Sequence, residues 1–352
     1  LMLSKTKGAW FYAVMFVSTI FAAATGIVGA SVTILGIMAG KTMIRTGYDT
    51  RLSAGLICAG GTLGILIPPS IMLVVMGPVL EIPVTDLFAA AIMPGILLAC
   101  LYAAYTTLRC YLNPKLGPVL PVNEQPTNMA KVWYEFIMGL IPPAGLVFFA
   151  LGSILFGLAT PTEGAGMGAF GAILLALAYK KLTLPGLKDA LLKTLEITAL
   201  IMFLVAASNF FGAVFSKLGT PSLLTDFLLN LEVNRYVILA IIMAAIFLLG
   251  WPLEWVPIVL IVLPIVLPLV IELGFNLTWF AILVAVNLQT AWLSPPVALS
   301  AYFLKGVVPE WDLKDIYLGM MQFMVIQVIG LILIIIFPKI ALWLPGVMYP
   351  SP

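Results

Sequence analysis

Apolar segments long enough to cross a lipid bilayer follow one another along almost the whole chain. They lie at about 9–44, 50–78, 87–108, 132–152, 160–179, 194–216, 235–273, 277–304 and 316–338. A hydrocarbon core of about 30 Å needs roughly 20 apolar residues in a helix. Charged residues make up only 9% of the chain, too few to cover a water-facing surface. We therefore expect an all-α polytopic membrane protein.

The remaining composition excludes several classes of protein. The chain has no histidine, and its three cysteines, Cys58, Cys100 and Cys110, have no paired spacing that would indicate a metal site or a disulfide framework. A net charge of +2 gives no reason to expect nucleic acid as a partner. Without histidine, an aspartate pair in adjacent helices or a phosphate-binding loop, we do not expect an enzyme.

Two of the apolar segments, 9–44 and 235–273, are too long for one crossing and too short for two crossings with a loop. Each has a break near its middle, "AATGIVGA" at 23–30 and "GWPLEW" at 250–255. A helical arm of about 15 residues rises roughly 22 Å, which brings each tip deep into the membrane. Both segments are predicted to be re-entrant helical hairpins.

The sequence repeats itself after 227 residues. "GYD" at 47–49 falls on "GFN" at 274–276, and the proline pair at 68–69 falls on the pair at 295–296. Each unit therefore reads as a hairpin, an interrupted helix, a short loop and another helix. Repeats with broken helices at matching positions are typical of secondary transporters.

The distribution of basic residues predicts that the two repeats are inverted. If the first hairpin starts from the cytoplasm, 14 of the 17 Lys and Arg residues fall in cytoplasmic stretches. The other three are Lys217, Arg235 and Lys339. This excess follows the positive-inside rule, and the same threading makes the second hairpin enter from the outside.

The proline pairs indicate where such a protein would bind its solutes. Proline removes a backbone donor, and unwound backbone survives in a membrane only where it is buried in protein or lines a cavity. Freed carbonyls can then hold a cation, and helix N-termini can face an anion. A packed proline kink would explain one break, but two equivalent breaks, each paired with a hairpin tip, favour a transport site.

These motifs resemble those of the large membrane subunit of TRAP (tripartite ATP-independent periplasmic) transporters. The matching stretches are "TGYD" at 46–49, "GTLGILIPPS" at 61–70, "LATPTEGAGMGA" at 158–169, "LGWPLEWVPIVLIVLPIVLPL" at 249–269 and "SPPVALS" at 294–300. The likeness spans nearly the whole chain and implies further residues ahead of Leu1. Nothing in the chain resembles the small membrane subunit of these systems.

The resemblance implies an elevator-type, sodium-coupled importer of a small organic acid in the bacterial inner membrane. It also implies two protein partners, a small DctQ-like membrane subunit and a periplasmic substrate-binding protein. The alternative is a divalent-anion or arsenite-type elevator carrier, which shares hairpins and inverted repeats but needs no binding protein.

The chain is divided accordingly into transport and scaffold parts. The expected transport segments are 1–78, with the first hairpin and broken helix, and 235–304, with the second. The expected scaffold and connecting segments are 79–131, 132–234 and 305–352.

The expected site residues lie at the tips and breaks. For sodium, the resemblance and the matching breaks indicate Gly26, Gly61, Thr62, Gly64, Trp251, Thr290 and Ser294. For substrate, they indicate Thr25, Gly26, Trp251, Glu254, Asn287, Trp292 and Ser294. Relatives with a serine-rich first tip differ from "AATGIVGA", which puts a serine hydroxyl ligand there in doubt but leaves the backbone carbonyls.

Two glutamates in apolar surroundings have different interpretations. Glu254 lies at a hairpin tip, where a carboxylate is costly and usually functional, and the alternative is a cap on its own half-helix. Glu163 follows Thr160 and Pro161 in the pattern of a capping box, so we expect it to stabilise a helix start. The stretch 182–196 alternates apolar and charged residues and predicts a helix on the cytoplasmic membrane surface.

Overall fold

The computed structural model describes residues 6–119, 129–231, 233–295 and 297–349, except for the side chains of 22–25, 129, 131 and 135. These residues form helices, turns and loops, and no β-strand occurs among them. Six of the described helices are long and apolar enough to cross a membrane. The expectation of an all-α polytopic membrane protein is confirmed.

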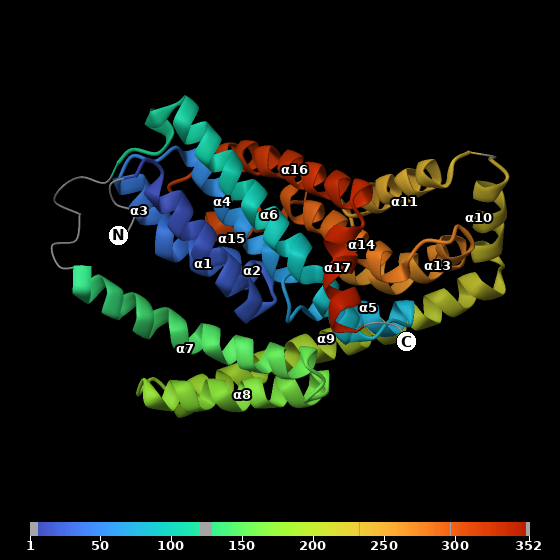
Figure 1. Ribbon diagram of the computed structural model, residues 1–352, viewed down its shortest axis with the longest axis horizontal. Coiled ribbons are helices and arrows are strands. Elements are labelled where there is room, and N and C mark those ends of the chain that lie inside the picture. Colours follow the sequence, from blue (N-terminus) through green and yellow to red (C-terminus); the bar gives the residue numbers. More distant parts are fainter. Residues whose placement is uncertain (1–5, 120–128, 232, 296, 350–352) are drawn as a thin grey trace.

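The α-helices follow one another along the chain with few long connections (Figure 1). Their bounds are α1 Ala9–Thr25, α2 Val28–Leu35, α3 Lys41–Arg45, α4 Thr50–Thr62, α5 Ile71–Leu80, α6 Val84–Leu112, α7 Met129–Leu155, α8 Pro161–Ala178, α9 Leu184–Lys217, α10 Thr220–Leu229, α11 Arg235–Leu249, α12 Trp255–Pro257, α13 Leu263–Glu272, α14 Leu277–Leu293, α15 Leu299–Val307, α16 Leu313–Ile336 and α17 Lys339–Met348. The described residues also form the π-helices η1 (Gly36–Gly40) and η5 (Ile258–Val262) and the 3₁₀ turns η2 (Leu63–Ile65) and η3 (Pro114–Leu116).

Helix starts recur with the spacing found in the sequence. α2 and α12 begin 227 residues apart, and so do α4 and α14. The caps also match, because the side chain of Asp49 accepts a hydrogen bond from the Leu52 amide at 2.8 Å and that of Asn276 accepts one from Trp279 at 2.9 Å. Helix ends are present at the interruptions expected at 23–30, 68–69 and 250–255, and α14 ends at Leu293, just before the interruption expected at 295–296.

The two halves of the chain pack into each other. α2 and η1, which follow the first tip, lie against α15, which follows the second break. In the same way η5 and α13, which follow the second tip, contact α5, which follows the first break. Glycines allow the first of these contacts. A Cβ atom at Gly29 would lie 2.9 Å from the Phe303 ring, and one at Gly36 would lie 2.7 Å from Val307. The close approach therefore requires residues without a side chain.

α16 packs on α4 at an equally close contact. A Cβ atom at Gly319 would lie 2.0 Å from the carbonyl oxygen of Arg51, and one at Gly55 would lie 2.5 Å from the carbonyl oxygen of Gly319. The Arg51 Nε donates to Asp315 Oδ1 at 2.8 Å at the same end of the pair. The two backbones therefore touch with no side chain between them.

Helices α7, α8 and α9 form a separate layer beside this packed block (Figure 1). Only 6% of the most apolar window of each is buried, against 50% for α6. The helix predicted at 182–196 is present, but it is the first part of α9, which runs unbroken from Leu184 to Lys217 and includes the apolar segment 194–216. No glycine or proline lies between Lys188 and Ser208 to end it. Helices α10 and α17 were not expected from the sequence.

The structural interpretation of Glu163 is confirmed. Its carboxylate accepts hydrogen bonds from the backbone and hydroxyl of Thr160 at 2.8 and 2.9 Å, and the Thr160 hydroxyl accepts the Glu163 amide at 3.3 Å. Together these contacts form a capping box at the start of α8.

Gly319→Ala is expected to destabilise the protein by about 2 kcal/mol or more, because overpacking against rigid backbone costs about 1–3 kcal/mol. The measurement is thermal unfolding of the detergent-solubilised protein. Gly306→Ala is the matched control, since nothing lies within 4 Å of a Cβ atom there. Equal unfolding temperatures for Gly319→Ala and wild type would contradict the contact between α16 and α4.

Candidate functional site

The first break is an irregular passage between α4 and α5. It contains the turn η2 and the cis peptide bond between Pro68 and Pro69. The Ser70 hydroxyl donates to the Ile65 carbonyl at 2.6 Å and caps α5. The tip between α1 and α2 lies on this passage, because a Cβ atom at Gly26 (φ +61°) would lie 3.2 Å from the Pro69 carbonyl oxygen.

The second break lies between α14 and α15. The Ser300 hydroxyl donates to the carbonyl oxygen of Trp292 across the break. Ser294 is 1% exposed, and its hydroxyl has no hydrogen-bond partner among the described residues. An unpaired buried hydroxyl is costly, so Ser294 is a candidate ligand for a bound ion or substrate.

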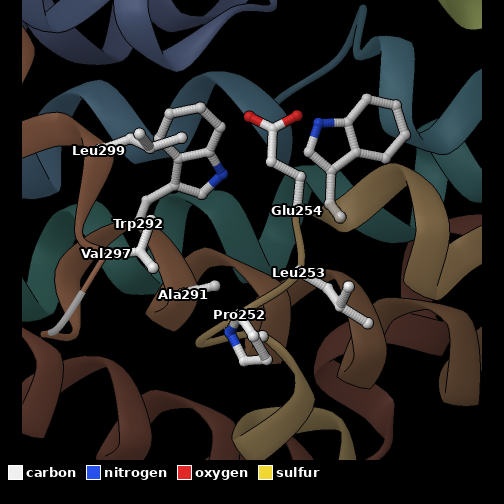
Figure 2. A pocket seen from close by; sticks show the side chains of 9 residues that line it. Pro252, Leu253, Glu254, Ala291, Trp292, Val297 and Leu299 are labelled. Carbon is white, nitrogen blue, oxygen red and sulfur yellow. The ribbon is translucent and has the colours of Figure 1, made fainter.

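A small pocket of about 60 Å³ joins the second tip to the second break (Figure 2). Glu254 and Trp292 lie on facing sides of it, with Pro252 and Leu253 from the tip and Ala291, Val297 and Leu299 from the break around them. This volume is well below the range of about 300–1,000 Å³ for small-molecule sites. The structure thus brings together two of the predicted substrate residues.

Phe303 of α15 connects this pocket to the first tip. Its ring stacks on Trp292, with centroids 6.4 Å apart and planes at 26°, and it also covers Gly29, three residues after the tip glycine. The two tips and the two breaks therefore share one region of the protein. Phe303 carries no signal in the sequence that distinguishes it from other apolar residues of the segment, and the sequence analysis missed it.

The two threonines expected at the sodium sites lie at the ends of their helices. The buried Thr62 hydroxyl donates to the Ala59 carbonyl at 2.8 Å, and the buried Thr290 hydroxyl donates to the Asn287 carbonyl at 2.5 Å. Each hydroxyl oxygen keeps lone pairs that can accept or ligate. Gly61 is in contact with Val32 of α2, and Gly64 is buried within η2.

Other predicted residues lie away from the pocket lining. The Asn287 amide donates to the Met243 carbonyl at 2.7 Å and so bridges α14 to α11. The Trp251 ring packs edge-on against Phe247, with centroids 5.7 Å apart. The side chain of Thr25 lies outside the described residues.

The helix ends give this region both signs of partial charge. α4 and α14 end at the breaks, so their last carbonyls present partial negative charge there. α2, α5 and α15 begin at the tip or the breaks and present partial positive charge. Such an arrangement can hold a cation and an anion close to each other.

The relatives found by comparison with known proteins all belong to one type of transporter. The family model described as "Tripartite ATP-independent periplasmic transporter, DctM component" matches residues 2–340. The chain is 29% identical to the C4-dicarboxylate TRAP transporter large permease protein DctM of Pseudomonas aeruginosa over 97% of this chain and 78% of that protein. It is 28% identical to the sialic acid TRAP transporter large permease protein SiaM of Vibrio cholerae, over 93% and 75%. It is also 27% identical to the isethionate TRAP transporter permease protein DctMQ of Oleidesulfovibrio alaskensis, over 87% and 47%.

Proposed function

The chain belongs to the DctM family of large membrane subunits of tripartite ATP-independent periplasmic transporters, and from this premise we propose that it carries a small organic acid inward together with sodium. The resemblance found in the sequence is thereby confirmed. The proteins of this family are multi-pass inner-membrane transporters, and the six apolar helices described above agree with this location.

One observation carries the proposal. Each half of the chain contributes one tip and one break, and all four lie around Phe303 and the pocket of Glu254 and Trp292. Unwound backbone is costly in a membrane, and transporters use it to bind solutes between repeats. On this reading the segments 9–44 and 235–273 are re-entrant hairpins of two inverted repeats.

Sodium is proposed to bind where each tip meets its break. The ligands would be carbonyl and hydroxyl oxygens of Gly26, Gly61, Thr62 and Gly64 at the first site and of Trp251, Thr290 and Ser294 at the second. Oxygen ligands suit a hard cation, and the C-terminal ends of α4 and α14 add negative partial charge. The unpaired hydroxyl of Ser294 supports the second site.

The substrate is proposed to be an organic anion bound beside the sodium ions. The names of relatives specify C4-dicarboxylates, sialic acid and isethionate, all of which are anions at neutral pH. The N-termini of α2, α5 and α15 would face its acidic group, with Gly26 and Ser294 donating from the first tip and the second break. Glu254 and Trp292 would line its other side. Thr25, Trp251 and Asn287 remain candidates for the same site.

The sequence predicts that the segments of α6 and α16 belong to the fixed scaffold, whereas the helix contacts favour placing both helices with the moving part. α6 and α16 pack on α4 and α14, and the Gln327 amide donates to the buried Gln289 side chain at 2.6 Å between α16 and α14. We propose that α6 and α16 move with the tips and breaks as one body. The exposed layer α7–α9 would then belong to the fixed scaffold.

The family implies the partners. TRAP large permeases work with a small membrane subunit and a periplasmic binding protein, and one relative is a fused DctMQ protein. We propose that a small subunit covers part of the exposed scaffold of this chain and that a binding protein delivers its substrate.

Thr62→Val and Thr290→Val are expected to raise the sodium concentration for half-maximal uptake by about tenfold each, which corresponds to about 1.4 kcal/mol of binding free energy. Thr106→Val is the matched control, because this buried threonine also donates to a backbone carbonyl but lies in α6, away from the breaks. Unchanged sodium activation in both Thr62→Val and Thr290→Val would remove these hydroxyls from the sites.

Reconstitution in liposomes tests the tripartite function. With an inward sodium gradient, uptake of a radiolabelled organic acid is expected only when the chain, its small membrane subunit and its binding protein are all present. The panel should include a C4-dicarboxylate, sialic acid and a sulfonate. Sodium-driven uptake by this chain alone would support the divalent-anion or arsenite-type carrier instead.

A further inference from the structure

A second polar site lies far along the chain from the breaks, in a groove where α9, α10 and α13 meet. The groove has a volume of about 390 Å³ and is open to the surroundings. We call it the acidic groove, and it is lined by Ser216, Gly219, Pro221, Ser222, Thr225, Asp226, Pro268 and Glu272. None of these residues lines the pocket of Glu254.

Two carboxylates in the acidic groove lie at the C-terminal ends of helices, where negative charge is unfavourable. Asp226 is in the last turn of α10, and Glu272 is the last residue of α13. The C-terminal end of a helix carries partial negative charge and is stabilised by cations, yet neither last turn contains a basic residue. Neither carboxylate forms an ion pair with any residue that the structure describes. The groove therefore has uncompensated negative charge.

Thr225 adds a second, independent indication. It is only 6% exposed, and its hydroxyl has no hydrogen-bond partner among the described residues. Helical threonines usually return this hydrogen bond to a carbonyl of the preceding turn, as Thr106 does. Leaving a buried hydroxyl unpaired is unfavourable unless something else binds its oxygen. Thr225 lines the same groove as both carboxylates.

We propose that the acidic groove binds a hard divalent cation, Ca²⁺ in preference to Mg²⁺. Asp226 and Glu272 supply charge, Thr225 supplies a hydroxyl oxygen, and water fills the remaining positions. Ca²⁺ accepts six to eight oxygen ligands in irregular geometry, whereas Mg²⁺ demands a near-ideal octahedron. A roomy groove assembled from three helices suits the larger ion. Lys217, the basic residue next to Ser216 in the sequence, does not line the groove, so it does not occupy the place of a metal ion.

The bound ion would join α10 to α13. α13 belongs to the second hairpin segment, whereas α10 follows α9 of the exposed layer. If the tips and breaks move against that layer, which rests on the proposed function, the ion joins the moving body to its surroundings. Millimolar Ca²⁺ would then slow transport, and its removal would release the hairpin.

Equilibrium dialysis with ⁴⁵Ca²⁺ on the purified detergent-solubilised chain tests the site directly. We expect one site with a dissociation constant on the order of 10⁻⁴–10⁻³ M, as in extracellular calcium modules. Asp226→Asn/Glu272→Gln should weaken binding by about tenfold or more, and Thr225→Val should weaken it by about threefold. Constant ionic strength keeps the screening of surface charge equal throughout.

Asp189→Asn/Glu196→Gln is the matched control, because it makes the same change of charge at exposed positions of α9 outside the groove. It should bind Ca²⁺ like the wild type. Equal loss of binding in this control, or unchanged binding in Asp226→Asn/Glu272→Gln, would overturn the site. A stronger affinity for Mg²⁺ than for Ca²⁺ would overturn the choice of ion.

Transport in the reconstituted complex tests the consequence separately. Millimolar Ca²⁺ should reduce sodium-driven uptake by about half or more in wild type and leave Asp226→Asn/Glu272→Gln unaffected. Wild-type uptake that is insensitive to Ca²⁺ would overturn the slowing of transport. Absence of uptake without Ca²⁺ would instead speak against the proposed function, since binding by dialysis requires no transport.

Discussion

Backbone that is not helical must be shielded from lipid by other parts of the protein, and this constraint determines which segments pack together. Each unpaired backbone group exposed to hydrocarbon costs several kcal/mol. The chain interrupts its helices at two tips and two breaks and brings all four to one region. The first tip lies on the Pro69 carbonyl, and the second tip closes over the second break in the pocket of Glu254. The positions that the chain must shield are thus the positions at which we propose solute binding.

Each half of the chain covers the interrupted backbone of the other half, and these contacts join distant parts of the chain into one packed body. The segment after the first tip packs on α15, the segment after the second tip packs on α5, and α16 locks onto α4 through backbone contact at Gly319. These contacts leave little freedom within the block. The layer α7–α9 shares few of them and remains exposed. A boundary between a rigid block and a loosely attached layer is what a sliding transport mechanism needs.

Local patterns in the sequence predicted the helix ends, whereas packing partners could not be read from it. The Pro68–Pro69 pair and the Thr160–Glu163 capping box act over a few residues, and each lies beside a helix end as expected. The 227-residue spacing recurs in the starts of α2 and α12 and of α4 and α14. The continuity of α9 was missed because charged and apolar stretches can share one helix. The partners of α16 depend on Gly55 and Gly319, 264 residues apart, and an isolated glycine does not reveal which backbone approaches it. The unpaired hydroxyls of Ser294 and Thr225 likewise exist only in the folded chain.

Cross-linking in a background with the three native cysteines replaced by alanine tests the central claim that the tips and breaks move as one body against α9. A disulfide between Gly40→Cys and Val308→Cys, where the Cβ atoms lie 3.6 Å apart, stays within the body and should leave sodium-driven uptake intact. A bifunctional thiol reagent joining Ala213→Cys of α9 to Ile265→Cys of α13, which line one groove, should abolish uptake. Full uptake after complete cross-linking of the α9–α13 pair would contradict the claim.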